Sequence, residues 1–239
     1  MMKLKLTKIS DDKEVIEMNI EFIEARDLPE AWFLCLERIV EVGYDYTIDR
    51  GSNEGQKRKE FDVAIIKIKF PGVRPLVPDV PPGLGLDPPT SMDYVEQYAA
   101  RYLMTSIKEA NEQYTYGEDL EKQIPELVQM YQEDGFGTNQ ACMSVGNADS
   151  IFLPDPQCLR IVDTRIRYGK FHIVVYFRSW DLYNGFSANL AALQLMKEEI
   201  VREINTKQKV EDGEIIAISK GLHLYDYAWS LAEIRVGKK

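Results

Sequence analysis

Cys158 is the residue of this chain whose sequence surroundings best fit a nucleophile. A cysteine attacks carbon as its thiolate, and a nearby cation is needed to stabilise that charge. The sequence supplies Arg178 as the cation, followed by Asp181 and Asn189. Most free cysteines are small buried hydrophobic residues, but a guanidinium, a carboxylate and a carboxamide in one short stretch favour a reactive thiol. Cys158 is therefore predicted to be a nucleophile.

The cysteine and histidine content argues against a metal centre and against a disulfide framework. The chain has three cysteines and two histidines, and no two cysteines have C-x-x-C spacing. A zinc site is therefore not expected, and Cys35 and Cys142 are expected to be ordinary packing residues. A small, odd number of cysteines in 239 residues favours a reducing compartment, so we expect a cytoplasmic protein without a metal.

The overall composition is that of a folded protein without a nucleic-acid partner. Hydrophobic residues make up 45% and charged residues 28% of the chain, and the formal net charge is -10. Binding to nucleic acid needs a basic face, whereas a pocket can hold a small anion with only a few donors. No stretch approaches the roughly 20 apolar residues of a membrane span, and the N-terminal residues lack a signal-peptide pattern. We expect neither nucleic acid nor a membrane as partner.

The elements that must position the candidate residues are clearest in the C-terminal half. Two strand-like runs, 158–166 and 171–177, are predicted to form a hairpin with a turn at 167–170. Apolar residues at helical spacing predict a long helix over 189–204. The remaining elements expected there are a strand over 214–219 and a last helix over 227–236.

The N-terminal half alternates shorter elements with irregular segments. Alternating apolar residues predict strands over 18–24 and 61–70, and a helix is predicted from the cap Asp27 to about Gly43. We therefore expect a single α+β domain over residues 1–239, with one large mixed or antiparallel sheet and helices packed against it. The other segments expected are a mobile loop over 45–59 with a solvated run at 56–60, a rigid proline-rich loop over 71–89, and helices over 92–111 and 118–132, the second interrupted or started by Pro125.

The order of motifs around Cys158 resembles that of the thymidylate synthases. In that family a nucleophilic cysteine opens a strand, and a Gly-Lys turn, an Arg-Ser-x-Asp motif, an asparagine on a long helix and a His-x-Tyr pair follow. The resemblance is best over residues 138–229 and implies the short archaeal-type branch, with a thymidylate synthase-like fold whose sheet forms a homodimer. The matching residues are Cys158, Gly169-Lys170, Arg178-Ser179-Trp180-Asp181, Gly185, Asn189 and His223-Leu224-Tyr225.

The resemblance implies a covalent route for methylating a pyrimidine nucleotide. Addition of the Cys158 thiolate to C6 of dUMP turns C5 into a nucleophile that takes the one-carbon unit of 5,10-methylenetetrahydrofolate. Arg178 and Ser179 would hold the 5′-phosphate, since a guanidinium grips phosphate oxygens in a bidentate manner. Asn189 would pair with the O4 and N3 edge of the ring and favour uracil over cytosine.

The same resemblance implies roles for further residues around the two substrates. His223 and Tyr225 would bind the ribose 3′-hydroxyl, and Asp181 and Gly185 would bind the folate. Tyr116 would assist removal of the C5 proton, and Glu96 would order a catalytic water. Arg50 would close over the phosphate.

Several positions depart from the family pattern. Asn139-Gln140 stand where the family usually donates two arginines to the phosphate across the dimer interface. Gln157 and Leu159 replace the usual proline and histidine on either side of the cysteine. The sequence also lacks the family's C-terminal segment, so we expect the folate pocket to close in another way or the one-carbon donor to differ.

Other functions remain open from the sequence. One is hydroxymethylation of a pyrimidine nucleotide, and another is a catalytically inactive nucleotide-binding or regulatory homologue, suggested by the missing arginine pair. A cysteine hydrolase using Cys158 and His223 fits the residue types alone. Methylation of dUMP is the leading hypothesis. The plainer alternatives for single residues are an Arg178–Asp181 ion pair, a helix cap at Asn189 and a solvated position for Glu96.

Overall fold

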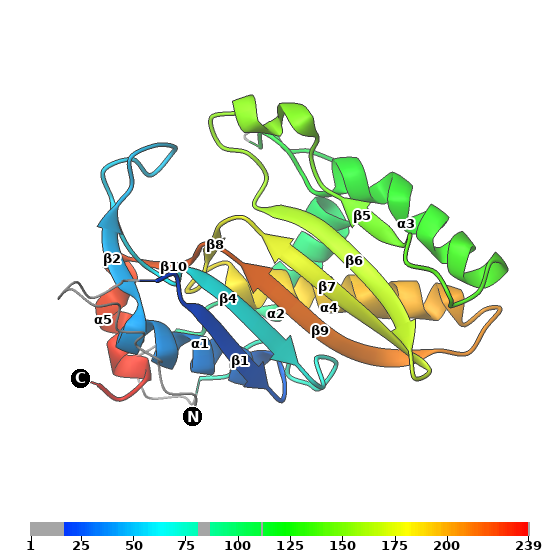
Figure 1. Cartoon of the computed structure of the whole chain (residues 1–239), viewed down its shortest axis with the longest axis horizontal. Helices are drawn as coiled ribbons and strands as arrows, with labels where there is room; N and C mark the ends of the chain where they lie inside the picture. Colours follow the sequence, from blue (N-terminus) through cyan, green and yellow to red (C-terminus); the bar gives the residue numbers. More distant parts are fainter. Residues whose placement is uncertain (1–16, 81–86, 111, 239) are drawn as a thin grey trace, which may run out of the picture.

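A six-stranded mixed sheet is the largest element of the computed structural model, which describes residues 17–80, 87–110 and 112–238 (Figure 1). The strand order is β1-β4-β9-β7-β6-β5, with parallel pairs at β1–β4 and β7–β9. In the turn between β6 and β7, Tyr168 and Gly169 have φ angles of 55° and 72°, as a tight two-residue hairpin requires. The strands are β1 (Ile20–Ala25), β4 (Val63–Ile68), β5 (Cys142–Ser144), β6 (Leu159–Arg167), β7 (Lys170–Phe177) and β9 (Glu211–Ser219).

Helices cover one face of this sheet, and the described helices leave the other face open (Figure 1). The alternation of strand residues explains the division, since β7 buries Phe171, Ile173, Val175 and Phe177. On the open face, Phe22 of β1 is 61% exposed. Helix α4 lies along the covered face and packs against α1, α2 and α3. These helices are α1 (Leu28–Val42), α2 (Met92–Tyr98), α3 (Gly117–Glu133) and α4 (Phe186–Ile204).

A smaller four-stranded sheet, in the order β2-β3-β10-β8, lies beside the first. Strand β8 follows β7 and β10 follows β9, so two neighbouring strands of the large sheet pass directly into the small one. The parallel pairing of Phe177 with Ser219 continues across this junction as the pairing of Trp180 with Leu222. The elements are β2 (Tyr44–Thr47), β3 (Lys57–Glu60), β8 (Trp180–Asp181), β10 (Leu222–Tyr225) and the adjacent α5 (Asp226–Arg235).

The loop predicted over 45–59 is wrong at both of its ends, because residues 45–47 and 57–59 belong to the paired strands β2 and β3. Lys59 Nζ lies 2.6 Å from Asp45 Oδ1 across the hairpin, and Glu60, expected to be solvated, is buried. Charged residues in β3 face aromatic residues of its neighbours, so no apolar alternation marks the strand in the sequence. The irregular part is the tip, residues 48–56, which we call the hairpin tip.

The helix predicted over 92–111 is shorter than expected. Helix α2 ends at Tyr98 and continues as a π-helix over Ala99–Leu103. The chain then turns so that Thr105 lies against Gly117, where an added Cβ would come within 1.8 Å of the Thr105 carbonyl oxygen. This close backbone approach accounts for the end of the helix and for glycine at 117. Asn111, the predicted end, lies outside the described residues.

Helix α3 confirms the prediction over 118–132 but without a break at Pro125. Proline removes one backbone hydrogen bond from the helix. Buried Leu120, Leu127 and Tyr131 hold α3 against the core on both sides of Pro125. Packing therefore outweighs the local preference, as it does in most protein helices.

The other predicted elements are confirmed with ends shifted by a few residues. The elements missed are β5, β8, β10 and a 3₁₀-helix over Ala148–Phe152, which are too short for a periodic pattern. In the proline-rich segment, Leu76 and Val77 are buried, whereas residues 81–86 lie outside the described part of the chain. No described helix has the length and apolar character needed to cross a membrane. The described residues form one α+β domain with two mixed sheets.

Candidate active site

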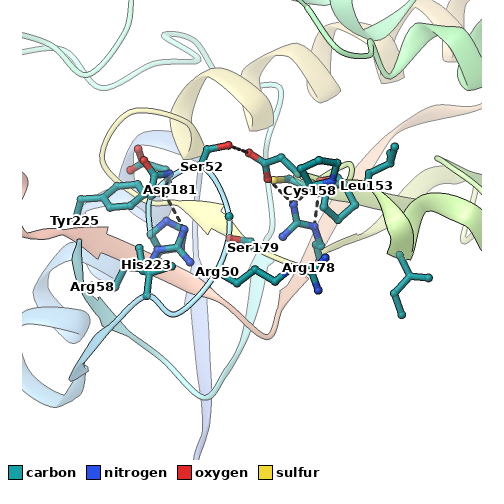
Figure 2. Close-up of a pocket in the computed structure, with 17 residues that line it drawn as sticks. Arg50, Ser52, Arg58, Leu153, Cys158, Arg178, Ser179, Asp181, His223 and Tyr225 are labelled. Carbon is teal, nitrogen blue, oxygen red and sulfur yellow. Dashed lines mark hydrogen bonds and ion pairs between the residues drawn. The ribbon is translucent and has the colours of Figure 1, made fainter. Parts of the chain in front are cut away.

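A cavity of about 390 Å³ lies where the two sheets meet, under the hairpin tip (Figure 2). Its walls are the hairpin tip, β3, the loop 151–156 that precedes the cysteine, the start of β8 and β10. Seven residues singled out from the sequence line it together: Arg50, Cys158, Arg178, Ser179, Asp181, His223 and Tyr225.

The continuous β7–β8 and β9–β10 pairing explains why residues so far apart in sequence meet here. Trp180 N donates to Gly221 O at 2.8 Å, and Leu182 N donates to His223 O at 2.8 Å. Arg178 and Ser179 occupy the crossing from β7 to β8, directly beside the crossing from β9 to β10. The two predicted motifs are therefore neighbours through backbone hydrogen bonds.

Cys158 is half-buried and sits immediately before β6. Arg178 N donates to Cys158 O at 2.9 Å, which fixes the cysteine at the cavity wall. Burial raises the pKa of the Cys158 thiol, the Arg178 charge opposes this, and the Asp155 charge adds to it. The net direction is upward, so the thiol is protonated at neutral pH before a ligand changes its surroundings. By contrast, Cys35 is fully buried in the core.

Arg178 pairs with Asp155, not with Asp181. Arg178 Nη2 lies 3.2 Å from Asp155 Oδ1, and its Nε donates to Pro156 O at 3.1 Å. The guanidinium therefore wraps the loop that leads to Cys158 (Figure 2). Asp181 Oδ1 instead accepts from Tyr183 N at 2.9 Å, so this carboxylate holds the turn before α4.

The hairpin tip is tied to both sides of the cavity. Ser52 Oγ donates to Asp155 Oδ2 at 2.7 Å, and Asn53 Nδ2 donates to Tyr225 Oη at 2.8 Å. Arg50, on the same tip, is exposed, and it has no ion-pair partner within the described part of the chain. An anion in the cavity would meet this unpaired guanidinium at the cavity mouth.

His223 and Tyr225 lie on the opposite side from Cys158 and Arg178, next to Arg58 (Figure 2). His223 Nδ1 lies 2.8 Å from Gly221 O. Burial, together with the positive charge of Arg58, lowers the pKa of His223 to about 3, so the ring is neutral. Tyr225 Oη lies 2.8 Å from Arg58 Nη2.

The structure does not bring four of the predicted residues to this cavity. Glu96 is exposed on α2, and its role in ordering water stays a prediction. Tyr116 lies behind the cysteine, where its hydroxyl accepts from Leu159 N at 3.3 Å. Gly185 precedes α4, and Asn189 lies within the first turn of that helix rather than capping it.

Asn189 is held by a tryptophan of the small sheet. Its Oδ1 accepts from Trp180 Nε1 at 2.9 Å, and Trp180 stacks on Phe177 with ring centroids 4.0 Å apart. The helix-cap alternative for Asn189 is therefore wrong, since Gly185 is the residue at the cap. A contact between Asn189 and a pyrimidine stays a prediction.

Tyrosines line a second cavity of about 410 Å³ that adjoins the first through a smaller one. Tyr98, Tyr102 and Tyr116 border the second cavity, while Tyr102, Tyr114 and Asp155 border the smaller one. Tyr98 stacks on Tyr102 at a centroid distance of 5.0 Å. These aromatic faces, close to Cys158, can stack on a flat heterocyclic ligand.

Sequence reasoning missed Ser52, Asn53, Arg58 and Asp155. The lysines and the glutamate around Arg58 predict a solvated run, but the Arg58 side chain lies on the face of β3 that lines the cavity. The Pro-Asp-Pro stretch around Asp155 predicts a turn, but it does not indicate which side chain the carboxylate contacts. Among the described residues, no group of His, Cys, Asp or Glu is arranged to hold a metal ion.

Comparisons with known proteins support a thymidylate synthase-like family. No protein-family profile matches the chain. Four curated archaeal proteins, each named "Putative thymidylate synthase", match 88% of it at 23–26% identity. The chain is thus similar to proteins named as thymidylate synthases.

The relatives come from Methanosarcina and Methanothermobacter species. The protein of Methanosarcina acetivorans is 26% identical over 217 residues, which cover 92% of that relative. The protein of Methanosarcina barkeri is 26% identical over the same length. The protein of Methanothermobacter thermautotrophicus is 23% identical over 223 residues, which cover 96% of it. The similarity therefore extends over nearly the whole length of these relatives.

Proposed function

We propose that this protein is a thymidylate synthase that converts dUMP to dTMP with 5,10-methylenetetrahydrofolate. The observation that supports it most is one cavity that joins Cys158, Arg178, Ser179, His223 and Tyr225. These are the residue types that a nucleophilic attack on a phosphorylated nucleoside needs: a thiol, an anion-binding guanidinium and hydroxyl-binding groups.

In the proposed reaction, the Cys158 sulfur forms a bond to C6 of the uracil ring, and the ring electrons move to C5 and O4. The cysteine must first lose its proton. The thiol proton passes to solvent; the Arg178 charge favours this ionisation and the Asp155 charge opposes it. Arg50 would close over the 5′-phosphate from the hairpin tip. Tyr116, behind the cysteine, would assist removal of the C5 proton.

The pterin of the donor is proposed to lie between Asp181 and the tyrosine-lined cavity. When bound, methylenetetrahydrofolate supplies the one-carbon unit and the hydride. Tyr102 and Tyr114 offer ring faces near Cys158, and Gly185 lies directly against Asp181, where an added Cβ would come within 3.2 Å of the Asp181 carbonyl oxygen. Aromatic walls of this kind suit a flat ring, so the residues present fit such a ligand.

A second candidate is an inactive nucleotide-binding homologue. The observations that favour it are the Asp155–Arg178 ion pair, which occupies the phosphate-binding guanidinium, and the raised pKa of Cys158.

The open face of the large sheet, where Phe22 is 61% exposed, is the proposed homodimer interface in both cases.

The test is covalent trapping with 5-fluoro-dUMP, with and without methylenetetrahydrofolate, followed by intact mass measurement. We expect a folate-dependent adduct that is lost in Cys158→Ala and retained in Cys142→Ala, because Cys142 is the other thiol accessible among the described residues. Tritium release from C5 of dUMP without dihydrofolate would indicate a hydroxymethylase. Binding of dUMP without an adduct would indicate the inactive homologue, and absence of binding would refute both proposals.

A further inference from the structure

The hydroxyl oxygen of Tyr225 accepts two hydrogen bonds from groups that can only donate. Arg58 Nη2 and Asn53 Nδ2 each lie 2.8 Å from Tyr225 Oη. Arginine and amide nitrogens have no acceptor to offer, so both lone-pair directions of the phenol oxygen are used. The hydrogen of Tyr225 must point away from both donors, and among the described residues it has no acceptor. Tyr225 is therefore a hydrogen-bond donor to whatever fills the cavity that it lines.

His223 has the opposite polarity, fixed by the backbone. Its Nδ1 lies 2.8 Å from Gly221 O, and a carbonyl oxygen cannot donate, so Nδ1 carries the hydrogen. The neutral ring then leaves Nε2 as a bare acceptor. Nε2 is buried and has no hydrogen-bond partner in the described part of the chain. A buried polar atom normally has a partner, so a ligand that supplies a hydrogen is expected here.

Together the two side chains form a matched donor and acceptor. Their rings lie 4.8 Å apart in an edge-to-face arrangement. A hydroxyl group both donates and accepts, so it can satisfy both partners at once. A hydrogen atom at the same position would satisfy neither, and a phosphate group would satisfy only Tyr225.

We propose that Arg58 is a positioning residue that fixes Tyr225 as a donor, so that Tyr225 and His223 together select a hydroxyl on the substrate. This inference rests on the proposed function, under which the hydroxyl is the ribose 3′-hydroxyl of dUMP. Arg58 would act through Tyr225 rather than by touching the nucleotide.

The contacts of Arg58 suit this role. Its Cζ lies 4.9 Å from the centroid of the Tyr225 ring, and β3 pairs Arg58 directly with Tyr225 of β10. Its Nη1 contacts Tyr46 Oη at 3.4 Å, and it forms no ion pair within the described residues. The guanidinium is thus held by two tyrosines rather than by a carboxylate. Its charge stays available to polarise the Tyr225 hydroxyl.

The test compares the dissociation constants of dUMP and 2′,3′-dideoxy-UMP by calorimetry. We expect the wild-type protein to prefer dUMP by about tenfold, because the dideoxy ligand leaves the buried His223 nitrogen unmet. In Arg58→Met the preference should fall to about twofold. Arg202→Met removes one positive charge from an exposed site on α4 and should keep the full preference.

Two further variants separate positioning from other effects. In Tyr225→Phe the preference should be small, and adding Arg58→Met should change it no further, because Arg58 acts through the missing hydroxyl. Asn53→Ala, a change at a half-buried residue of the hairpin tip, should lower the preference in part, and it tests the same oxygen if Arg58→Met does not fold.

Each outcome decides the inference. Equal weakening of both ligands in Arg58→Met would mean that Arg58 binds the phosphate directly, which overturns it. An unchanged preference in Arg58→Met and in Asn53→Ala would overturn it as well. Wild-type protein that binds dUMP without preferring it refutes the inference alone. Wild-type protein that binds neither ligand refutes the proposed function and the inference with it.

Discussion

Asp155 stands between the hairpin tip and the guanidinium of Arg178, and its replacement by asparagine tests how the cysteine is controlled. The carboxylate accepts from Ser52 Oγ at 2.7 Å and lies 3.2 Å from Arg178 Nη2. Burial is the largest cause of the raised pKa of the Cys158 thiol. The charge of Arg178 lowers this pKa, and the charge of Asp155 raises it further. Asparagine keeps the size and one oxygen but removes the charge. We therefore expect Asp155→Asn to lower the pKa of Cys158 and to leave Arg178 freer to bind phosphate.

The size of the effect follows from the exposure of the ion pair. The Arg178 and Asp155 side chains are 28% and 43% exposed, so solvent screens their attraction. Ion pairs of this kind contribute roughly 0.2–1 kcal/mol. A phosphate that displaces Asp155 must overcome this energy, so Asp155→Asn should bind dUMP about 1.5- to 5-fold more tightly. The gain should shrink as salt is added, because salt screens the competing pair.

Two assays measure the two effects separately. Alkylation of Cys158 by iodoacetamide, followed by peptide mass spectrometry across pH, should show a midpoint at lower pH in Asp155→Asn than in the wild-type protein. Calorimetry gives the affinity for dUMP. Asp149→Asn makes the same charge change at an exposed position on the 3₁₀-helix that precedes the loop and should alter neither value. A midpoint that moves to higher pH, or equal effects in Asp149→Asn, would refute the electrostatic reasoning.

Three further predictions concern stability, each measured by urea unfolding. The pKa of His223 is about 3 in the folded protein and about 6.5 in the unfolded chain. The stability that the neutral ring contributes is therefore complete above pH 6.5 and is lost below it. Between pH 7 and 5 the wild-type protein should lose about 2 kcal/mol more than His223→Gln, and equal losses would contradict this. Gly117→Ala should cost about 3 kcal/mol because its Cβ would collide with the Thr105 carbonyl, whereas Gly137→Ala, with open space around it, should cost little. Lys197 is fully buried with Nζ 3.0 Å from Asp212, so Lys197→Met should cost about 1–3 kcal/mol, and a neutral effect would show that the pair adds nothing.

The elements that could be predicted from the sequence are those with a clear periodic pattern. Strands β6 and β7 have alternating apolar residues and a turn that tolerates positive φ at Tyr168 and Gly169. The β2–β3 hairpin could not be predicted, because its pairing depends on contacts such as Lys59 with Asp45 and on burial of Glu60. Glu60 in turn faces His223 of β10, a strand far along the sequence.

The candidate site shows the same division between local pattern and tertiary contact. Cys158, Arg178 and His223 were found because their types and order form a known motif, and the sheet pairing brings them to one cavity. The partner of Arg178 could not be predicted, since Asp181 is its near neighbour in the sequence whereas Asp155 is 23 residues away. Asp181 accepts a hydrogen bond from Tyr183 N, and Asp155 is the carboxylate that forms the ion pair with the Arg178 guanidinium.

The unbroken parallel pairing from the large sheet into the small one also determines where this protein tolerates insertions. An extra residue between Phe177 and Trp180 would shift Arg178 and Ser179 against their neighbours on β10, because the backbone bonds at Gly221 and His223 fix that spacing. At the opposite end of the same strands, Glu211 N donates to Gly169 O at 2.8 Å, and the turn residue before Gly169 lies outside this pairing. Tyr168, in the β6–β7 turn, is 96% exposed, so a peptide tag or fluorophore placed there would leave the cavity end of the sheet undisturbed.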